Sequence, residues 1–390
     1  MRFLTSPTSL AALALLLTAG TAGAGPLNPP AGPIASTYKT LQDAEPRTAI
    51  NATNTPGTAD SAYRITQPGS YYLTGDLVVT GDRHGIVIAA HNVTIDLNGF
   101  SIRGSNAEGR AGIIGGLHQL RNINIRNGSI RDFALAGVSF SDHDDWSRPR
   151  LGRVEHLRIS NCGVGIGPGG EYTVADCNIS GGATGIYGWG ELLVERCHVT
   201  ETSGVGIFSL TGSTTVRQCR IDDPGTHGVQ ITQGIVEACE IVSPGQNGVH
   251  IFSSGVVRAC SISTAAERGI VTGLGSLIES NRVHNYGDAG IRADQCSRIV
   301  NNLVFYSLAV NPTSTQVAIE APTGGCHIEG NTITKGDIGI QAQAGGNLII
   351  RNAFPGIGTV WSLSGTNSYG PLAGGGGQFS TTNPLANVTY

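Results

Sequence analysis

The sequence predicts an all-β solenoid, a single-stranded right-handed parallel β-helix of about twelve coils with a capping segment at each end. Three observations predict it. A glycine followed by Ile or Val recurs along most of the chain, at intervals of 20 to 22 residues between Gly165 and Gly290. Each interval holds two short strand patterns, as in residues 228–231 and 235–241. Glycine is abundant, at 57 of 390 residues, whereas charged residues make up only 13%, about half the usual share of a soluble domain.

The strand patterns alternate Ile or Val with polar residues, which places the apolar side chains inside a tube and the polar ones outside. Strands this short, separated by glycine-containing turns, leave no room for helices between them. Parallel strands of successive coils then stack at about 4.8 Å, so that side chains one repeat apart in the sequence become neighbours.

A second row of residues recurs once per coil: Asn98, Gly128, Leu157, Cys177, Cys197, Cys219, Cys239, Cys260, Asn281, Asn302, Asn331 and Asn352. We interpret it as an internal ladder at a bend, where Asn side chains hydrogen-bond from coil to coil and Cys serves as a small buried apolar residue. The coil spacing also allows disulfides between neighbours. Five Cys cannot all pair, however, so we expect stacked thiols there, with Cys296 and Cys326 as the best candidate disulfide.

The two ends of the chain have different patterns. Residues 1–24 predict a secretory signal peptide, since Arg2 precedes an apolar run and small residues that end at Ala24. That run is too short to span a bilayer, and no later segment approaches the roughly 20 apolar residues required. We therefore expect no membrane span and a secreted or periplasmic location. Residues 25–80 and 355–390 are expected to cap a β-helix of residues 81–354.

The charge of the chain bears on its partners. The net charge is −4 and the basic residues are scattered, which argues against nucleic acid as a partner. We expect the chain to act as a monomer.

The repeated IxxNxI and IxxCxI patterns resemble those of the right-handed parallel β-helix superfamily, which contains pectate lyases, polygalacturonases and mannuronan epimerases. The resemblance covers roughly residues 81–354 and is specific for the fold. It implies a substrate groove along the strand that begins at each Gly-Ile or Gly-Val. Enzyme-specific patterns are mostly missing: residues 222–223 and 226–228 fall in one coil without a following Arg-x-Lys, and there is no Trp-x-Asp-His.

Outward positions of that strand form two columns. The first contains Tyr187, Phe208, Gln230, His250, Val271, Arg292, Glu320 and Gln341, and the second contains Trp189, Leu210, Thr232, Phe252, Gly273, Asp294, Pro322 and Gln343. Aromatic rings stack on the apolar faces of sugars while polar groups orient them. The predicted substrate-binding residues are therefore Tyr187, Trp189, Phe208, Gln230 and Phe252. The alternative is that a long loop covers the rings at Tyr187, Trp189 and Phe208.

Ionisable groups gather at the other end of the columns: His250, Arg268, Arg292, Asp294 and Glu320 are the candidate catalytic residues. A lyase that cleaves uronic-acid chains needs a cation to neutralise the carboxylate, a role for Arg268 and Arg292, and a base, a role for His250. An inverting hydrolase would instead use Asp294 and Glu320. The simpler alternative is that Arg292 only pairs with Glu320 across one coil step.

Two groups of residues bear on metal binding. In the loop of residues 139–153, Asp142, Asp144 and Asp145 suit a hard cation such as calcium, although acidic loops are more often merely solvated. His84, His227 and His250 are separated by coils or columns and do not predict a transition-metal site.

The sequence thus predicts a carbohydrate-active protein whose partner is a polysaccharide. The favoured hypothesis is a lyase for uronic-acid-containing glycans, ahead of a hydrolase. The alternative is a β-helix without activity that binds glycans or belongs to the cell envelope or surface. No cofactor other than the calcium alternative is predicted.

Overall fold

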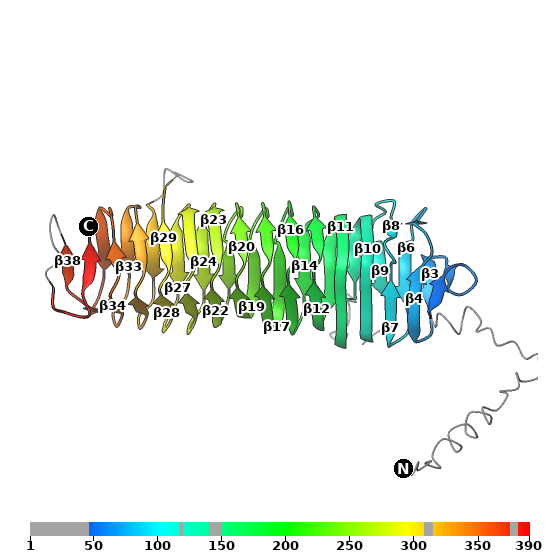
Figure 1. Cartoon of the computed structure of the whole chain (residues 1–390), viewed down its shortest axis with the longest axis horizontal. Coiled ribbons are helices and arrows are strands. Elements are labelled where there is room, and N and C mark those ends of the chain that lie inside the picture. The colour runs from blue at the N-terminus through cyan, green and yellow to red at the C-terminus, as the bar shows by residue number, and fades with distance from the viewer. Residues whose placement is uncertain (1–46, 118–119, 141–149, 308–314, 375–380) are drawn as a thin grey trace, which may run out of the picture. The chain divides into compact units, whose positions relative to one another are not determined.

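The computed structural model describes residues 47–117, 120–140, 150–307, 315–374 and 381–390. It confirms the predicted fold class. All regular elements in these ranges are β-strands, and they wind through about fourteen turns rather than the twelve predicted. Figure 1 shows the strands of successive turns side by side. The described part of the chain contains no helix long and apolar enough to cross a membrane.

The strands form three parallel ladders, which the chain visits in the order 1, 2, 3 within each coil. Four long strands belong to more than one ladder. All three ladders contain parts of β10 (Arg121–Ser139) and β11 (Arg150–Gly169). Ladders 1 and 2 contain parts of β17 (Ile207–Arg217) and β19 (Val229–Glu237). Ladder 1, which carries the Gly-Ile and Gly-Val repeat, further contains β3 (Ser61–Ile65), β6 (His84–Ile88), β9 (Ala111–Gly115), β14 (Thr184–Gly188), β21 (Val249–Ile251), β24 (Arg268–Thr272), β27 (Ala289–Ala293), β30 (Val317–Ala321), β33 (Ile338–Ala342) and β36 (Thr359–Leu363).

Ladder 2 further contains β1 (Thr48–Ile50), β4 (Gly69–Leu73), β7 (Val93–Asp96), β12 (Glu171–Ala175), β15 (Leu192–Glu195), β22 (Gly255–Arg258), β25 (Leu277–Glu279), β28 (Arg298–Val300), β31 (His327–Glu329), β34 (Leu348–Ile350) and β37 (Ser368–Tyr369). Ladder 3 further contains β5 (Leu77–Val78), β8 (Ser101–Arg103), β13 (Asn178–Ser180), β16 (His198–Thr200), β18 (Arg220–Asp222), β20 (Glu240–Val242), β23 (Ser261–Ala265), β26 (Arg282–Tyr286), β29 (Leu303–Phe305), β32 (Thr332–Thr334), β35 (Ala353–Phe354) and β39 (Asn387–Thr389). Outside this scheme, β2 (Pro56–Thr58) pairs antiparallel with β3, and β38 (Leu372–Gly374) pairs with β39.

Gly228 shows why glycine begins each ladder 1 strand. A Cβ atom on Gly228 would lie 2.5 Å from Cγ2 of Ile241 and 2.7 Å from the carbonyl oxygen of Gly248. Any larger residue would collide with the core and with the next coil. The two residues that follow Gly228 in the inward direction, Val229 and Ile231, are fully buried. The repeat therefore reflects packing inside the tube.

The polar internal ladder is confirmed at Asn281, Asn302, Asn331 and Asn352. The Nδ2 atom of Asn302 donates to the carbonyl oxygen of Ile278 at 2.9 Å and to Oδ1 of Asn331 at 3.0 Å. The backbone N–H of Asn302 also donates to that Oδ1 atom, at 2.9 Å. Asn387 extends the row by one position, which the sequence did not predict, and accepts from Asn352.

The cysteines of the row are buried free thiols, as expected. Each donates to a nearby carbonyl oxygen, as Cys239 does to Glu237 at 3.3 Å. The proposed disulfide between Cys296 and Cys326 is wrong, because both are free thiols. Cys296 is exposed, whereas Cys326 is buried and its Sγ atom donates to the carbonyl oxygen of Asp294 at 3.4 Å.

One assignment at the start of the row is also wrong. Asn98 is exposed, and the neighbouring Leu97 is fully buried instead. A Cβ atom on Gly128 in the next coil would lie 2.4 Å from Cβ of Leu97, so Leu97 and Gly128 occupy stacked positions. The turn after β7 is two residues longer than the turn in β10, which shifts Asn98 out to solvent.

Parallel pairing extends on both sides of residues 81–354. Before this range, β1 pairs with β4 and β3 pairs with β6. After it, β36 pairs with β33, β37 with β34 and β39 with β35. The expected signal peptide, residues 1–24, and the first part of the expected capping segment lie outside the described residues.

Candidate functional site

The outward face of ladder 1 has the register that the repeat predicted. The structure pairs Tyr187 with Phe208, Phe208 with Gln230, Gln230 with His250, His250 with Val271, Val271 with Arg292, Arg292 with Glu320, and Glu320 with Gln341. Residues that are 20 to 28 positions apart in the chain therefore form one column across eight coils.

Three of the predicted sugar-binding aromatic residues meet at the N-terminal end of this column. The ring centroid of Tyr187 lies 5.9 Å from that of Trp189 and 5.4 Å from that of Phe208. All three side chains are half-buried. Gln230 follows Phe208 on the next coil and is also half-buried. Residues 141–149 lie outside the described part, so the alternative that a loop covers the rings stays open.

His250 lies between two rings on the same face. Its ring centroid is 4.3 Å from that of Phe252, which is 52% exposed, and 5.3 Å from that of His227. The Nδ1 atom of His250 is buried and has no hydrogen-bond partner. The exposed ring of Phe252 thus lies beside the titratable imidazole of His250.

His227 is a part of this site that the sequence interpretation missed. The prediction placed His227 and His250 in separate columns, whereas their rings are in contact. The reason is the bend at Gly228, which turns the preceding residue outward beside the column. The same position is occupied by Asn247 on the next coil, whose backbone N–H and Nδ2 atom both lie 3.3 Å from Nδ1 of His227.

Electrostatics keep the histidine pair neutral. Burial lowers the pKa of His250 below its ordinary value, and the neighbouring His227 and Arg268 lower it further. Burial also lowers the pKa of His227. Both imidazoles are therefore unprotonated near neutral pH, the form in which a histidine accepts a proton.

Arg268 lies one coil further along, at the position that His227 and Asn247 occupy in their coils. Its terminal nitrogen forms an ion pair with Asp288, a residue that the prediction did not include. Its Nε atom is buried and has no hydrogen-bond partner. The guanidinium is held in place by one carboxylate while part of its donor capacity is unused.

Arg292 and Glu320 form the pair that the simpler alternative described. One terminal nitrogen of Arg292 donates to both carboxylate oxygens of Glu320, at 3.1 Å each. Glu320 is only 8% exposed. Asp294 is half-buried and follows Arg292 by two residues on the same side of the strand. Of the predicted catalytic set, His250 and Arg268 come together, and Arg292 and Glu320 form a separate ion pair.

Within the described ranges, no metal-ligand cluster forms at His227 and His250. Among the residues that it describes, no group of three or more His, Cys, Asp or Glu side chains is arranged to hold a metal ion. His84 lies in another part of the chain, where its Nδ1 atom accepts from the backbone N–H of Ala111. The candidate calcium ligands Asp142, Asp144 and Asp145 lie outside the described residues.

Taken together, ladder 1 presents aromatic rings, a neutral imidazole and a partly satisfied guanidinium along one row of coils. Rings suit the apolar faces of sugars, the guanidinium suits a carboxylate, and the imidazole suits an acidic proton. Such a face can bind an extended, anionic polyhydroxyl chain.

Comparisons with known proteins agree with the fold. No curated protein matches the sequence. Two solved structures that resemble it are modules of enzymes from Azotobacter vinelandii. The A-module of mannuronan C-5 epimerase AlgE6 has a TM-score of 0.55 and 15% identity over 83% of this chain and 90% of that one. The A-module of mannuronan C-5 epimerase AlgE4 has a TM-score of 0.50 and 15% identity over 77% and 90%.

At this identity the likeness to those structures shows the fold alone. A family model provides stronger evidence: the model described as "Right handed beta helix region" matches residues 76–279, which is more than half of the chain. The chain belongs to the right-handed β-helix family.

Proposed function

We propose that ladder 1 binds a polysaccharide containing uronic acid and cleaves it by β-elimination. His250 would remove the proton on the carbon next to the uronate carboxylate, and Arg268 would neutralise the charge that develops on that carboxylate. A carbon–carbon double bond then forms as the bond from the next carbon to the glycosidic oxygen breaks, and the departing oxygen takes up a proton from solvent. The observation that carries this proposal is the position of Arg268 one coil beyond His250. From there its positive charge helps to keep the imidazole of His250 neutral, and its own Nε atom has no hydrogen-bond partner.

The spacing of the face supports a polymeric substrate. Tyr187 and His250 are three coils apart, about 15 Å at the usual distance between strands, which matches roughly three sugar units. The aromatic cluster would bind neighbouring sugars while His250 acts on one of them. The two similar modules are named mannuronan C-5 epimerases, and epimerisation at C-5 begins with the same removal of a proton beside a carboxylate.

The test is turnover of polygalacturonate, polymannuronate and polyguluronate, each with and without a chelator. Elimination produces unsaturated ends that absorb ultraviolet light, together with new reducing ends. We expect His250→Ala to lower kcat by about 10²-fold to 10⁴-fold and Arg268→Ala by about 10²-fold to 10³-fold. The chelator arm tests the proposed calcium role of Asp142, Asp144 and Asp145.

Two matched controls lie on other faces of the molecule. His284→Ala removes a half-buried histidine of ladder 3 that stacks on Phe305 with 5.0 Å between centroids. Arg258→Ala removes an arginine of ladder 2 that pairs with Glu237. Both should retain full activity. Absence of unsaturated product from every substrate would contradict the elimination reaction.

A second candidate function is glycan binding without turnover. The closed Arg292–Glu320 pair favours it, because both oxygens of Glu320 already accept hydrogen bonds and are not free to act as a hydrolase carboxylate. Binding of a polyuronate that depends on Tyr187 and Phe208, without any product, would support this candidate over the lyase.

We also propose that the chain is exported to the periplasm or the medium as a monomer. The N-terminal pattern of residues 1–24 supports the export part of this proposal. Cell fractionation and sequencing of the mature N-terminus should place cleavage after Ala24, and the sedimentation velocity of the purified protein should match one chain.

A further inference from the structure

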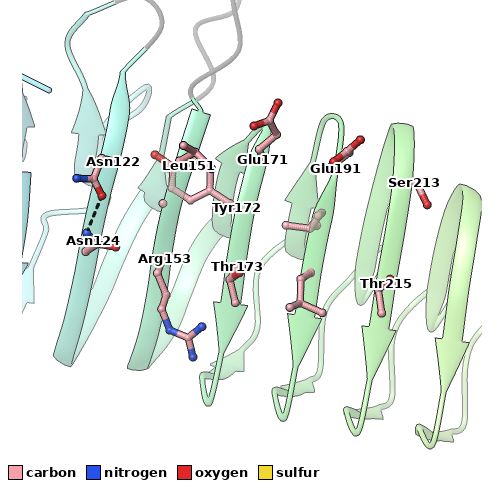
Figure 2. A pocket seen from close by; sticks show the side chains of 13 residues that line it. Asn122, Asn124, Leu151, Arg153, Glu171, Tyr172, Thr173, Glu191, Ser213 and Thr215 are labelled. Atoms are coloured by element: carbon pink, nitrogen blue, oxygen red, sulfur yellow. Dashed lines mark hydrogen bonds between the residues drawn. The ribbon is translucent and has the colours of Figure 1, made fainter. Parts of the chain in front are cut away.

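A hollow of about 710 Å³ opens on the outward face of ladder 2, on a different strand face from the proposed lyase site. It crosses five successive strands and is lined by Asn122, Asn124, Leu151, Gly152, Arg153, Glu171, Tyr172, Thr173, Glu191, Leu192, Leu193, Ser213 and Thr215. We call it the ladder 2 groove. Figure 2 shows its polar side chains in two rows, with Glu171, Glu191 and Ser213 in one and Arg153, Thr173 and Thr215 in the other.

The groove lies where the shape of the coil changes. Asn92, Asn122 and Leu151 occupy equivalent positions in three successive coils. All three have positive φ angles, of 55°, 53° and 57°. In the pairing of β11 with β12 the register shifts between Arg150 and Gly152, so Leu151 is an extra residue without a partner. A bulge of this kind redirects side chains, and bulges are frequent beside binding sites.

Leu151 is unusual at this bulge for two independent reasons. Left-handed backbone suits Asn or Gly, as in the two preceding coils, and is costly for a leucine. Leu151 is also 66% exposed, among the most exposed large apolar side chains of the described residues. Neither backbone preference nor burial accounts for leucine here, which points to a role in contact with a ligand.

Tyr172 packs in the core beneath Leu151 and stacks on Phe140, with 5.3 Å between the ring centroids. Its ring lies over Gly152, where an added Cβ would come within 2.2 Å of Cε1 of Tyr172. The side chain is 3% exposed, and its hydroxyl is buried without a hydrogen-bond partner. Tyr172 therefore supports the bulge from the core side, while Leu151 stays exposed.

The charges of the groove select among ligands. Glu171 and Glu191 are exposed on neighbouring coils, just before the paired residues Tyr172 and Leu192. Arg153, the cation of the groove, forms an ion pair with Glu155. The two exposed carboxylates would therefore repel a polyuronate. Carboxylates and amides bind vicinal hydroxyls well, and the exposed Leu151 suits the apolar face of a sugar ring.

We infer that the ladder 2 groove is a second glycan site, which binds an uncharged oligosaccharide through Leu151, Glu171 and Glu191. This inference does not depend on the proposed lyase reaction. Five coils extend about 20 Å, the length of roughly four sugar units.

The experiment is calorimetric titration of the full chain carrying His250→Ala, in the presence of a chelator, with cellohexaose, xylohexaose, mannohexaose, maltohexaose and hexagalacturonate. At least one neutral hexasaccharide should bind. Leu151→Asn and the double variant Glu171→Gln, Glu191→Gln should each weaken that binding tenfold or more. Leu348→Asn, at an exposed leucine of ladder 2 outside the groove, should bind as the parent does.

Leu151→Asn keeps the test free of folding failure, because Asn suits the left-handed turn and the melting temperature should stay equal or rise. The inference is overturned if no neutral hexasaccharide binds, or if both groove variants bind as tightly as the parent. It is also overturned if hexagalacturonate is the ligand whose binding depends on Leu151. Since binding is measured without turnover, these outcomes are separate from success or failure of the lyase proposal.

Discussion

Asn302 shows how single residues hold this fold together. Its side chain accepts from the backbone N–H and the Nδ2 atom of Asn281 and donates to Asn331, so it links three coils inside the tube. All these groups are buried. A buried polar group that loses its partner costs about 1–3 kcal/mol.

Asn302→Ala should therefore lower the free energy of unfolding by about 2–4 kcal/mol, because two donors of Asn281 lose their acceptor. Chemical denaturation measures this. Cys239→Ala is the control at an equivalent row position, where only a weak thiol hydrogen bond and a small volume are lost, at about 1 kcal/mol. Equal losses for the two variants would show that the Asn row has no special part in stability.

The histidine of the candidate site is open to direct titration. Burial, His227 and Arg268 all favour its neutral form, so we expect a pKa of His250 below the ordinary value of 6.5 by NMR. Arg268→Gln should raise that pKa because it removes a positive charge. A pKa of His250 at or above 6.5, or no change in the variant, would contradict the geometry.

The lowered pKa of His250 also predicts how the free energy of unfolding depends on pH. A histidine whose pKa is lower in the folded state binds protons more readily when unfolded, so stability falls as pH decreases through 6.5. Burial also lowers the pKa of His84, His227 and His284. The denaturation midpoint should therefore be lower at pH 5 than at pH 7.5, and replacing His250 with Gln should reduce that difference.

At the scale of the elements, the register of the ladder 1 strands places residues one repeat apart in the sequence side by side on one face. β27 supplies Arg292 and β30 supplies Glu320, and their register places the two charges beside each other on successive coils. Glu320 is 8% exposed and therefore depends on its partner.

Arg292→Ala should destabilise the protein by about 1–3 kcal/mol, because it leaves a mostly buried carboxylate unpaired. Adding Glu320→Ala should recover part of that loss. Chemical denaturation of the parent, the two single variants and the double variant gives the free energies of unfolding for a double-mutant cycle. Strict additivity would mean that the pair contributes no coupling energy.

The strand register of ladder 1 could be predicted because one glycine per coil is required by close packing, as at Gly228. Departures from the prediction follow local backbone changes that the repeat does not encode. The bend before Gly228 turns His227 toward His250, and a longer turn moves Asn98 to the surface. The bulge at Leu151 could not be predicted from the sequence either, because leucine does not indicate a left-handed backbone.

At the scale of the whole described solenoid, each coil contacts mainly the coils before and after it. The coil count exceeded the prediction because the first and last coils lack the Gly-Ile pattern. In β3, for example, Tyr63 occupies the position that pairs with Ile86, and in β36 Trp361 occupies the position that pairs with Ile340.

This modularity predicts that a complete coil can be removed. Deleting Cys219–Ala238, which is 20 residues, joins Gln218 to Cys239 and restores the same row. The shortened chain should fold cooperatively with unchanged β-sheet circular dichroism. Deleting only Cys219–Gly228 should prevent folding, since it shifts all later strands to the wrong ladder. Normal folding of both chains would contradict the register.

The most direct test of the account is a crystal structure of His250→Ala with a bound hexauronate. We predict sugar rings along ladder 1 over Tyr187 and Phe208, with one carboxylate at the guanidinium of Arg268. A hexauronate bound on another face, or a ladder 1 face that stays empty at saturating ligand, would contradict it.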